Sequence, residues 1–136
     1  MPITLQAEAS SSLSSGSLRL YALPYGCIDL YNYDPLNRRA AVGIMVATEH
    51  RRQGYALAML KALEKLYSPH RPENSQLSTL NSQFSTLHSL YADIAASNTA
   101  SIALFRKAGY TECGHFKDWL VVNDKYIDSI RMQLIL

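Results

Sequence analysis

The chain has few of the residues that build metal and redox sites. Its 136 residues include only two cysteines, Cys27 and Cys113, and their separation fits neither a metal site nor a redox pair. We expect both thiols to pack as small apolar side chains. The four histidines are scattered along the sequence, so no metal site is expected.

The chain also has neither a large excess of one charge nor a long apolar run. A net charge of +2 without a long basic run argues against nucleic-acid binding. No apolar run is long enough to span a membrane, and residues 1–17 lack the pattern of a signal peptide. A hydrophobic content of 48% is sufficient for one core. We therefore expect a single-domain cytoplasmic protein that does not bind membranes.

Apolar patterning and turn residues predict an α/β (α+β) fold with a mixed, largely antiparallel sheet and two main helices. One helix should follow residue 54 and end near Tyr67, and the other should occupy about residues 98–109. The strand–helix–strand order between residues 39 and 94 implies a right-handed crossover and hence one parallel pair. The expected strands are residues 18–23, 26–33, 39–47, 90–94, 110–116 and 125–136.

The most informative stretch is residues 46–61, VATEHRRQGYALAMLK. It predicts the end of a strand, a tight turn with Arg51, Arg52 and Gly54, and then a helix. The start of a helix has unpaired N–H groups and the positive end of the helix dipole, so it attracts phosphate. Glycine allows close approach of the backbone, and arginine adds charge-assisted hydrogen bonds. The spacing fits neither a Walker loop nor a dinucleotide fingerprint, yet it indicates a diphosphate-bearing ligand.

Four segments in the same order resemble the GNAT superfamily of acetyltransferases. Residues 51–56, RRQGYA, match its Arg/Gln-x-x-Gly-x-Gly/Ala signature, and residues 98–110, NTASIALFRKAGY, resemble its second cofactor motif. Residues 28–33 followed by 38–44, and residues 126–134, are similar to the branch of spermidine and ribosomal-protein amino-terminal acetyltransferases. The resemblance covers about residues 18–67 and 90–136. It implies a GNAT-like fold that is shortened at the N-terminus, without the usual first strand and two helices.

The resemblance also implies a co-substrate, acetyl-CoA, and a site. A backbone N–H at a splay in the strand before the turn, at about Ile44 to Val46, would stabilise the negative charge that develops on the thioester oxygen. The backbone from Met45 to Ala47 would pair with the pantetheine arm like an added strand. The expected cofactor-binding residues are Val46, Ala47, Arg51, Arg52, Gln53, Gly54, Tyr55, Ala56, Asn98, Ser101, Phe105 and Lys107.

Two positions leave the chemistry of the site open. Many relatives carry a tyrosine, thought to protonate the departing thiolate, where this chain has Phe105, which has no proton to donate. Glu49 is the nearest carboxylate to the turn and a candidate base, although the helix dipole alone also favours an acidic residue there. Asn98 is expected as a helix cap, a pantetheine ligand or both.

The remaining segments contribute less to the prediction. Residues 1–17 form a Ser-rich segment with little to bury, and residues 18–136 are expected to form one acetyltransferase-like domain. A low-complexity insertion at about residues 68–89 contains two nearly identical heptads, residues 74–80 and 81–87. We interpret it as a tolerated insertion, with a helix that docks onto a partner as the alternative. An exposed sheet edge favours a homodimer.

The leading hypothesis is direct acetyl transfer from acetyl-CoA to a primary amine, either a polyamine or a protein N-terminus. The alternative is a shortened, non-catalytic acetyltransferase-like domain that binds CoA or a protein partner.

Overall fold

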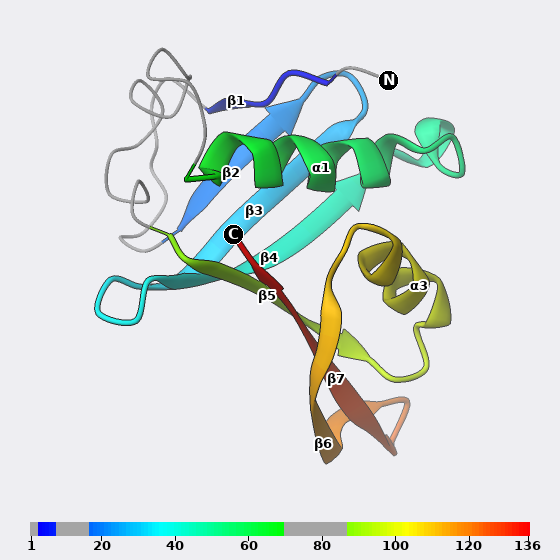
Figure 1. The fold of residues 1–136 in the computed structure, drawn as a ribbon. Helices are drawn as coiled ribbons and strands as arrows, with labels where there is room; N and C mark the ends of the chain where they lie inside the picture. Colours follow the sequence, from blue (N-terminus) through cyan, green and yellow to red (C-terminus); the bar gives the residue numbers. More distant parts are fainter. Residues whose placement is uncertain (1–2, 8–16, 70–86) are drawn as a thin grey trace.

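The computed structural model describes residues 3–7, 17–69 and 87–136, which form one seven-stranded sheet with two α-helices (Figure 1). The strand order is β1-β2-β3-β4-β5-β7-β6. β4 and β5 are parallel, and every other neighbouring pair is antiparallel. The predicted mixed sheet with one parallel pair is therefore confirmed. The strands are β1 (Gln6–Ala7), β2 (Leu18–Ala22), β3 (Gly26–Asp34), β4 (Arg39–Val46), β5 (Ser89–Ala95), β6 (Thr111–Val122) and β7 (Lys125–Ile135).

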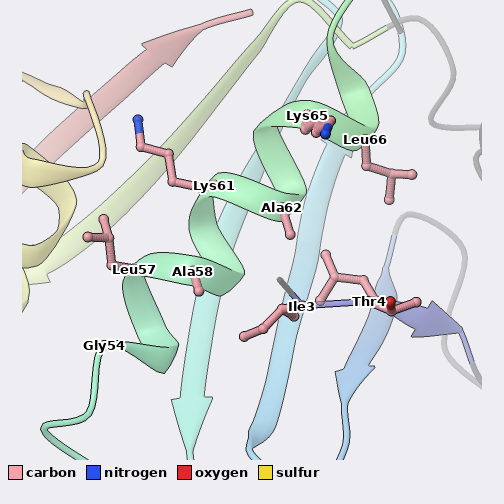
Figure 2. A pocket seen from close by; sticks show the side chains of 10 residues that line it. Ile3, Thr4, Gly54, Leu57, Ala58, Lys61, Ala62, Lys65 and Leu66 are labelled. Carbon is pink, nitrogen blue, oxygen red and sulfur yellow. The ribbon is translucent and has the colours of Figure 1, made fainter. Parts of the chain in front are cut away.

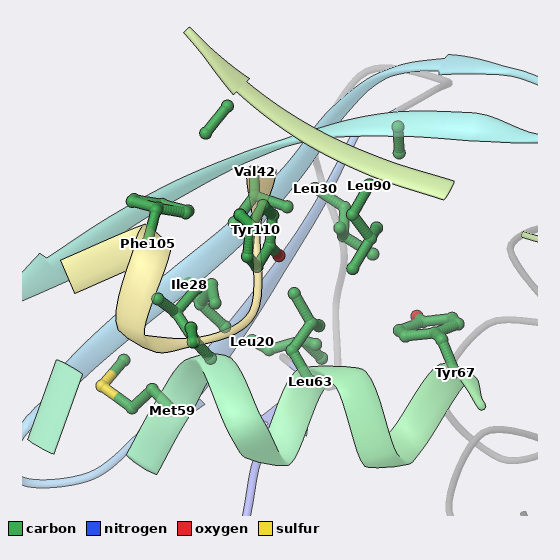
Figure 3. Close-up of a cluster of buried hydrophobic side chains, with 14 of the residues drawn as sticks. Leu20, Ile28, Leu30, Val42, Met59, Leu63, Tyr67, Leu90, Phe105 and Tyr110 are labelled. Atoms are coloured by element: carbon green, nitrogen blue, oxygen red, sulfur yellow. The ribbon is translucent and has the colours of Figure 1, made fainter. Parts of the chain in front are cut away.

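Helix α1 (Tyr55–Tyr67) lies across β2, β3 and β4 and buries one stripe of side chains (Figure 1). The buried residues recur at intervals of three and four, the spacing that places side chains on one helix face. Figure 3 shows Met59 and Leu63 of this stripe close to Leu20 and Ile28 of the sheet. Burial of each such side chain contributes roughly 1.5–3 kcal/mol. The buried residues of α1 are Met59, Leu60, Leu63 and Tyr67.

Helix α3 (Thr99–Lys107) begins and ends as the sequence predicts. The Asn98 side chain accepts a hydrogen bond of 3.1 Å from the Ser101 N–H, which caps the first turn. At the other end, Gly109 has a φ of 100°. Neither helix in the described residues is long and apolar enough to cross a membrane.

The N-terminal residues differ from the prediction, because residues 3–7 pack onto the domain. β1 pairs with β2, and Leu5 is only 3% exposed. Figure 2 shows Ile3 beside α1, where the two segments border a groove of about 750 Å³. Ile3, Leu5 and Ala7 alternate with polar residues, so one face of this short segment is apolar.

The serine-rich residues 10–15 and most of the repeated heptads lie outside the described residues. Leu87, the last residue of the second heptad, is buried, and Ser89 already belongs to β5.

Tyr110 carries a buried hydroxyl that has no hydrogen-bond partner among the described residues. Burial raises the pKa of this phenol well above its ordinary value. The unfolded chain loses the proton at about pH 10 whereas the folded chain keeps it, so stability falls as the pH rises above that value. We expect Tyr110→Phe to increase the free energy of unfolding by about 1 kcal/mol, since it removes the unpaired group. The gain should increase above pH 10, as measured by urea unfolding at pH 7.5 and 10.5.

Tyr126→Phe is the matched control, because the Tyr126 side chain is 70% exposed. It should leave both unfolding curves unchanged. Equal loss of stability at high pH in the Tyr110 variant and the parent would contradict the assignment.

Candidate functional site

The turn between β4 and α1 contains left-handed backbone conformations, which most residue types rarely adopt. A short 3-10 helix, η1 (Thr48–His50), leads into it, and Arg52 has a φ of 62°. Gly54 follows with a φ of 84° and is the N-cap of α1. Glycine is favoured here because it adopts this left-handed conformation without the strain that a Cβ adds. No described side chain caps α1, so its first N–H groups are left for a ligand.

A cavity of about 450 Å³ lies between this turn and α3. It brings together residues of the two sequence motifs, which are more than 40 positions apart in the chain. The predicted residues that line it are Val46, Arg51, Arg52, Gly54, Tyr55, Ala56, Ser101 and Lys107. His50, Leu57, Ala100 and Leu104 line it as well and were not predicted. The cavity is therefore lined by cationic side chains, by the start of α1 and by apolar side chains.

A gap between β4 and β5 lies beside this cavity, at the splay predicted in the strand before the turn. β4 and β5 pair only through three residue pairs, from Arg39 with Ser89 to Ala41 with Tyr91. Beyond these pairs β4 remains bonded to β3, and β5 remains bonded to β7, while the two parallel strands diverge (Figure 1). Ile44 and Met45 lie on the diverging part of β4, where the resemblance placed the oxyanion donor.

The structure does not support the predicted role of the Ala47 backbone in pairing with the pantetheine arm. Its N–H donates to the Tyr25 carbonyl at 2.7 Å, and its carbonyl accepts from the His50 N–H at 2.9 Å. The carbonyl of Val46 accepts from Arg51 Nε at 3.2 Å. The backbone groups at the end of β4 thus form hydrogen bonds within the turn. The Arg51 guanidinium, which was predicted to bind phosphate, also stabilises this turn.

Four further predicted residues lie outside the lining of the cavity. Glu49 is exposed on η1, and Gln53 Nε2 donates to its carbonyl at 3.4 Å, so this pair stabilises the turn. Asn98 caps α3. Phe105 is only 3% exposed and packs edge-on against Tyr110, with ring centroids 5.0 Å apart. Phe105 is therefore a core residue, because its position on α3 faces the sheet and not the cavity.

The sequence reasoning missed the contribution of the β2–β3 turn. The Tyr25 ring stacks on Tyr55 with a centroid distance of 3.9 Å, and His50 contacts both rings edge-on. A hydrogen bond with Tyr25 is the main reason that the pKa of Tyr55 is raised. Next to it, a Cβ on Gly26 would lie 2.0 Å from the Met45 carbonyl oxygen. The only signal in the sequence was the turn-forming Pro-Tyr-Gly triplet at residues 24–26.

Comparison with known proteins agrees with this geometry. Residues 14–111 match the family model described as "Acetyltransferase (GNAT) domain". A curated spermidine N(1)-acetyltransferase of Vibrio cholerae is 26% identical over 110 residues, which cover 81% of this chain and 56% of the relative. The chain thus spans little more than half the length of that relative.

Solved structures show the same fold. A mutant of the Vibrio cholerae spermidine N-acetyltransferase superposes with a TM-score of 0.73 and 22% identity, covering 90% of this chain and 67% of the other. The structure of that enzyme with CoA and spermine gives a TM-score of 0.70 and 22% identity, covering 89% and 66% of the two chains. Because the family model matches more than half of this chain, the chain belongs to the GNAT acetyltransferase family.

Proposed function

We propose that this protein transfers the acetyl group of acetyl-CoA directly to a primary amine, a polyamine or a protein N-terminus. The amine nitrogen, after losing a proton, attacks the thioester carbonyl carbon. The carbon–sulfur bond then breaks, and the CoA thiolate leaves and takes up a proton. The acetylated amine and CoA are the two products.

The observation that carries the proposal is the cavity shared by the two motifs. The diphosphate of acetyl-CoA is proposed to lie against Gly54 and the first N–H groups of α1. Arg51 and Arg52 are exposed beside it, and Arg52 and the terminal N–H groups of Arg51, whose Nε donates to the Val46 carbonyl, would supply charge-assisted hydrogen bonds. Ser101 and Lys107 border the same space from α3.

From this cavity the pantetheine arm is proposed to enter the gap between β4 and β5. The carbonyl to be attacked then lies beside Ile44 and Met45, past the last β4–β5 residue pair. A backbone N–H in this part of β4 would donate to the oxygen as negative charge develops on it. The position of the donor is fixed by the pairing of β4 with β3, which continues to Val46.

One observation favours the non-catalytic alternative, a domain that binds CoA without turnover. Phe105, at the position of the tyrosine of many relatives, has no proton to donate and is buried in the core, and the candidate base Glu49 does not line the cavity. Direct transfer does not require a general acid in the site, because the CoA thiolate is already a good leaving group at neutral pH.

Calorimetric titration of acetyl-CoA into the protein tests the proposal. We expect a dissociation constant in the micromolar range, and we expect acetyl-pantetheine, which lacks the diphosphate and the nucleotide, to bind at least about tenfold more weakly. A screen of amines with detection of released CoA then tests turnover. Binding without turnover of any amine would establish the non-catalytic alternative, and equal affinities for both thioesters would place the cofactor away from the turn.

A further inference from the structure

The face of the sheet that points away from α1 and α3 carries aromatic and charged side chains at the mouth of the gap. Tyr31, Ala41 and Tyr91 are directly paired across β3, β4 and β5, so their side chains are on one face. Their neighbours Leu30 and Leu90 are fully buried in the core beneath the helices. Tyr31 and Tyr91 therefore project from the opposite, outer face.

Tyr31 leans toward the gap. A Cβ on Gly43 would lie 3.5 Å from the Tyr31 ring, which places this ring over the diverging part of β4. The pKa of the Tyr31 phenol is raised, first by burial and then by the nearby charge of Asp93 and by Tyr91. Groups from β3 and β5 thus face each other across the gap, where a bound thioester would be reached from the outer side.

The carboxylate at this mouth is fully engaged by an arginine. Asp93 and Arg131 are directly opposite each other on β5 and β7, and both oxygens accept hydrogen bonds from the guanidinium, at 2.7 and 2.9 Å. The guanidinium also lies over the Tyr91 and Phe116 rings, 4.5 and 5.3 Å from their centroids. These four contacts hold Arg131 in one position, and the two hydrogen bonds neutralise the charge of Asp93.

The second carboxylate on this face is cancelled in the same way. Asp29, two residues before Tyr31 on β3, accepts hydrogen bonds from Arg19 Nε and Arg19 Nη2 at 2.7 and 2.9 Å. Arg19 is its direct partner on β2. Asp29 and Asp93 are therefore both held in bidentate pairs with an arginine on the neighbouring strand.

We propose that Arg131 determines the class of acceptor: by neutralising Asp93 it makes the mouth of the gap select a singly charged amine, such as a peptide N-terminus, over a polyamine. This inference rests on the proposed acetyl transfer. A polyamine gains affinity from free carboxylates, one for each ammonium group that it must desolvate. A single amine that is deprotonated for attack needs only hydrogen-bonding and apolar groups, which Tyr31 and Tyr91 offer.

The test compares acceptors at saturating acetyl-CoA, with initial rates of CoA release. The probes are spermidine and a short peptide that has a free N-terminus and no lysine, arginine or acidic residue. We expect kcat/KM of the parent protein to be at least about tenfold higher for the peptide. Arg131→Gln uncovers one carboxylate and should raise kcat/KM for spermidine about fivefold through KM, the effect of one charge at close range in water.

Arg131→Lys and Arg38→Gln are the controls. Arg131→Lys keeps the positive charge, so spermidine should remain a poor acceptor; Arg38→Gln removes one charge from the β3–β4 turn, far from the gap, and should change neither substrate. A parent protein that prefers spermidine overturns the inference alone, even if Arg131→Gln fails to fold. An unchanged spermidine KM in folded Arg131→Gln also overturns it, whereas no turnover of any amine contradicts the proposed function itself.

Discussion

Replacing Gly54 by aspartate together with Arg51 by alanine is expected to raise the dissociation constant for acetyl-CoA at least about tenfold. The aspartate places a negative charge at the start of α1, where the diphosphate is proposed to lie. It also forces a side chain onto a backbone with a φ of 84°. Loss of Arg51 removes a cation from the cavity and the hydrogen bond to the Val46 carbonyl. Calorimetry with acetyl-CoA measures the change.

Two controls separate charge from backbone strain. Gly54→Asn is nearly isosteric with aspartate, tolerates the left-handed conformation and is neutral, so it should bind more tightly than Gly54→Asp. Arg38→Ala removes a distant arginine and should leave the dissociation constant unchanged. Equal binding by the double variant and the parent, with both folded by circular dichroism, would show that the diphosphate does not lie at this turn.

Gly26→Ala is expected to lower the free energy of unfolding by about 2–3 kcal/mol and the melting temperature on the order of 10 °C. The new methyl group would lie 2.0 Å from the Met45 carbonyl oxygen, and the Val46 Cα is also within 2.9 Å. These are backbone atoms, so they move only if the end of β4 moves. Scanning calorimetry of the purified variant measures the loss, and acetyl-CoA affinity should fall with it because β4 leads into the turn.

Gly43→Ala is the matched control on the same pair of strands. Its methyl group would meet only the Tyr31 ring, at 3.5 Å, which is an ordinary contact. We expect a change below about 1 kcal/mol, since alanine in a strand also loses less backbone entropy than glycine. Similar melting temperatures for both variants would mean that the β2–β3 turn does not hold the end of β4 in place.

Local sequence patterns predicted most of the fold. The spacing of Met59, Leu60 and Leu63 fixed the buried face of α1, and Asn98 and Gly109 marked the limits of α3. Errors arose where a short segment depends on its neighbours. The alternation of Ile3, Leu5 and Ala7 is too short to predict a strand, and Gln6–Ala7 becomes one because it pairs with β2 and Leu5 is buried in the core.

The turn was predicted in more detail than the rest of the site. Gly54, Arg51 and Arg52 follow one another in the chain, so a short motif describes their geometry directly. The roles expected of Phe105 and of the Ala47 backbone depend on which way an element faces and on which groups distant segments supply. Tyr25 reaches the turn from another hairpin and takes the Ala47 N–H, an interaction that no local pattern encodes.

The sequence by itself determined the order of β2 to β7 and the two helices along the chain, the glycine turn before α1 and the family. Each of these follows from residues close together in the chain, through side-chain periodicity, caps and backbone preferences. Only the tertiary structure decided where β4 and β5 diverge. It also decided that Arg131 neutralises the charge of Asp93, which is 38 residues away in the chain. Such pairings depend on strand register, and register is set by the packing of the whole sheet against its core.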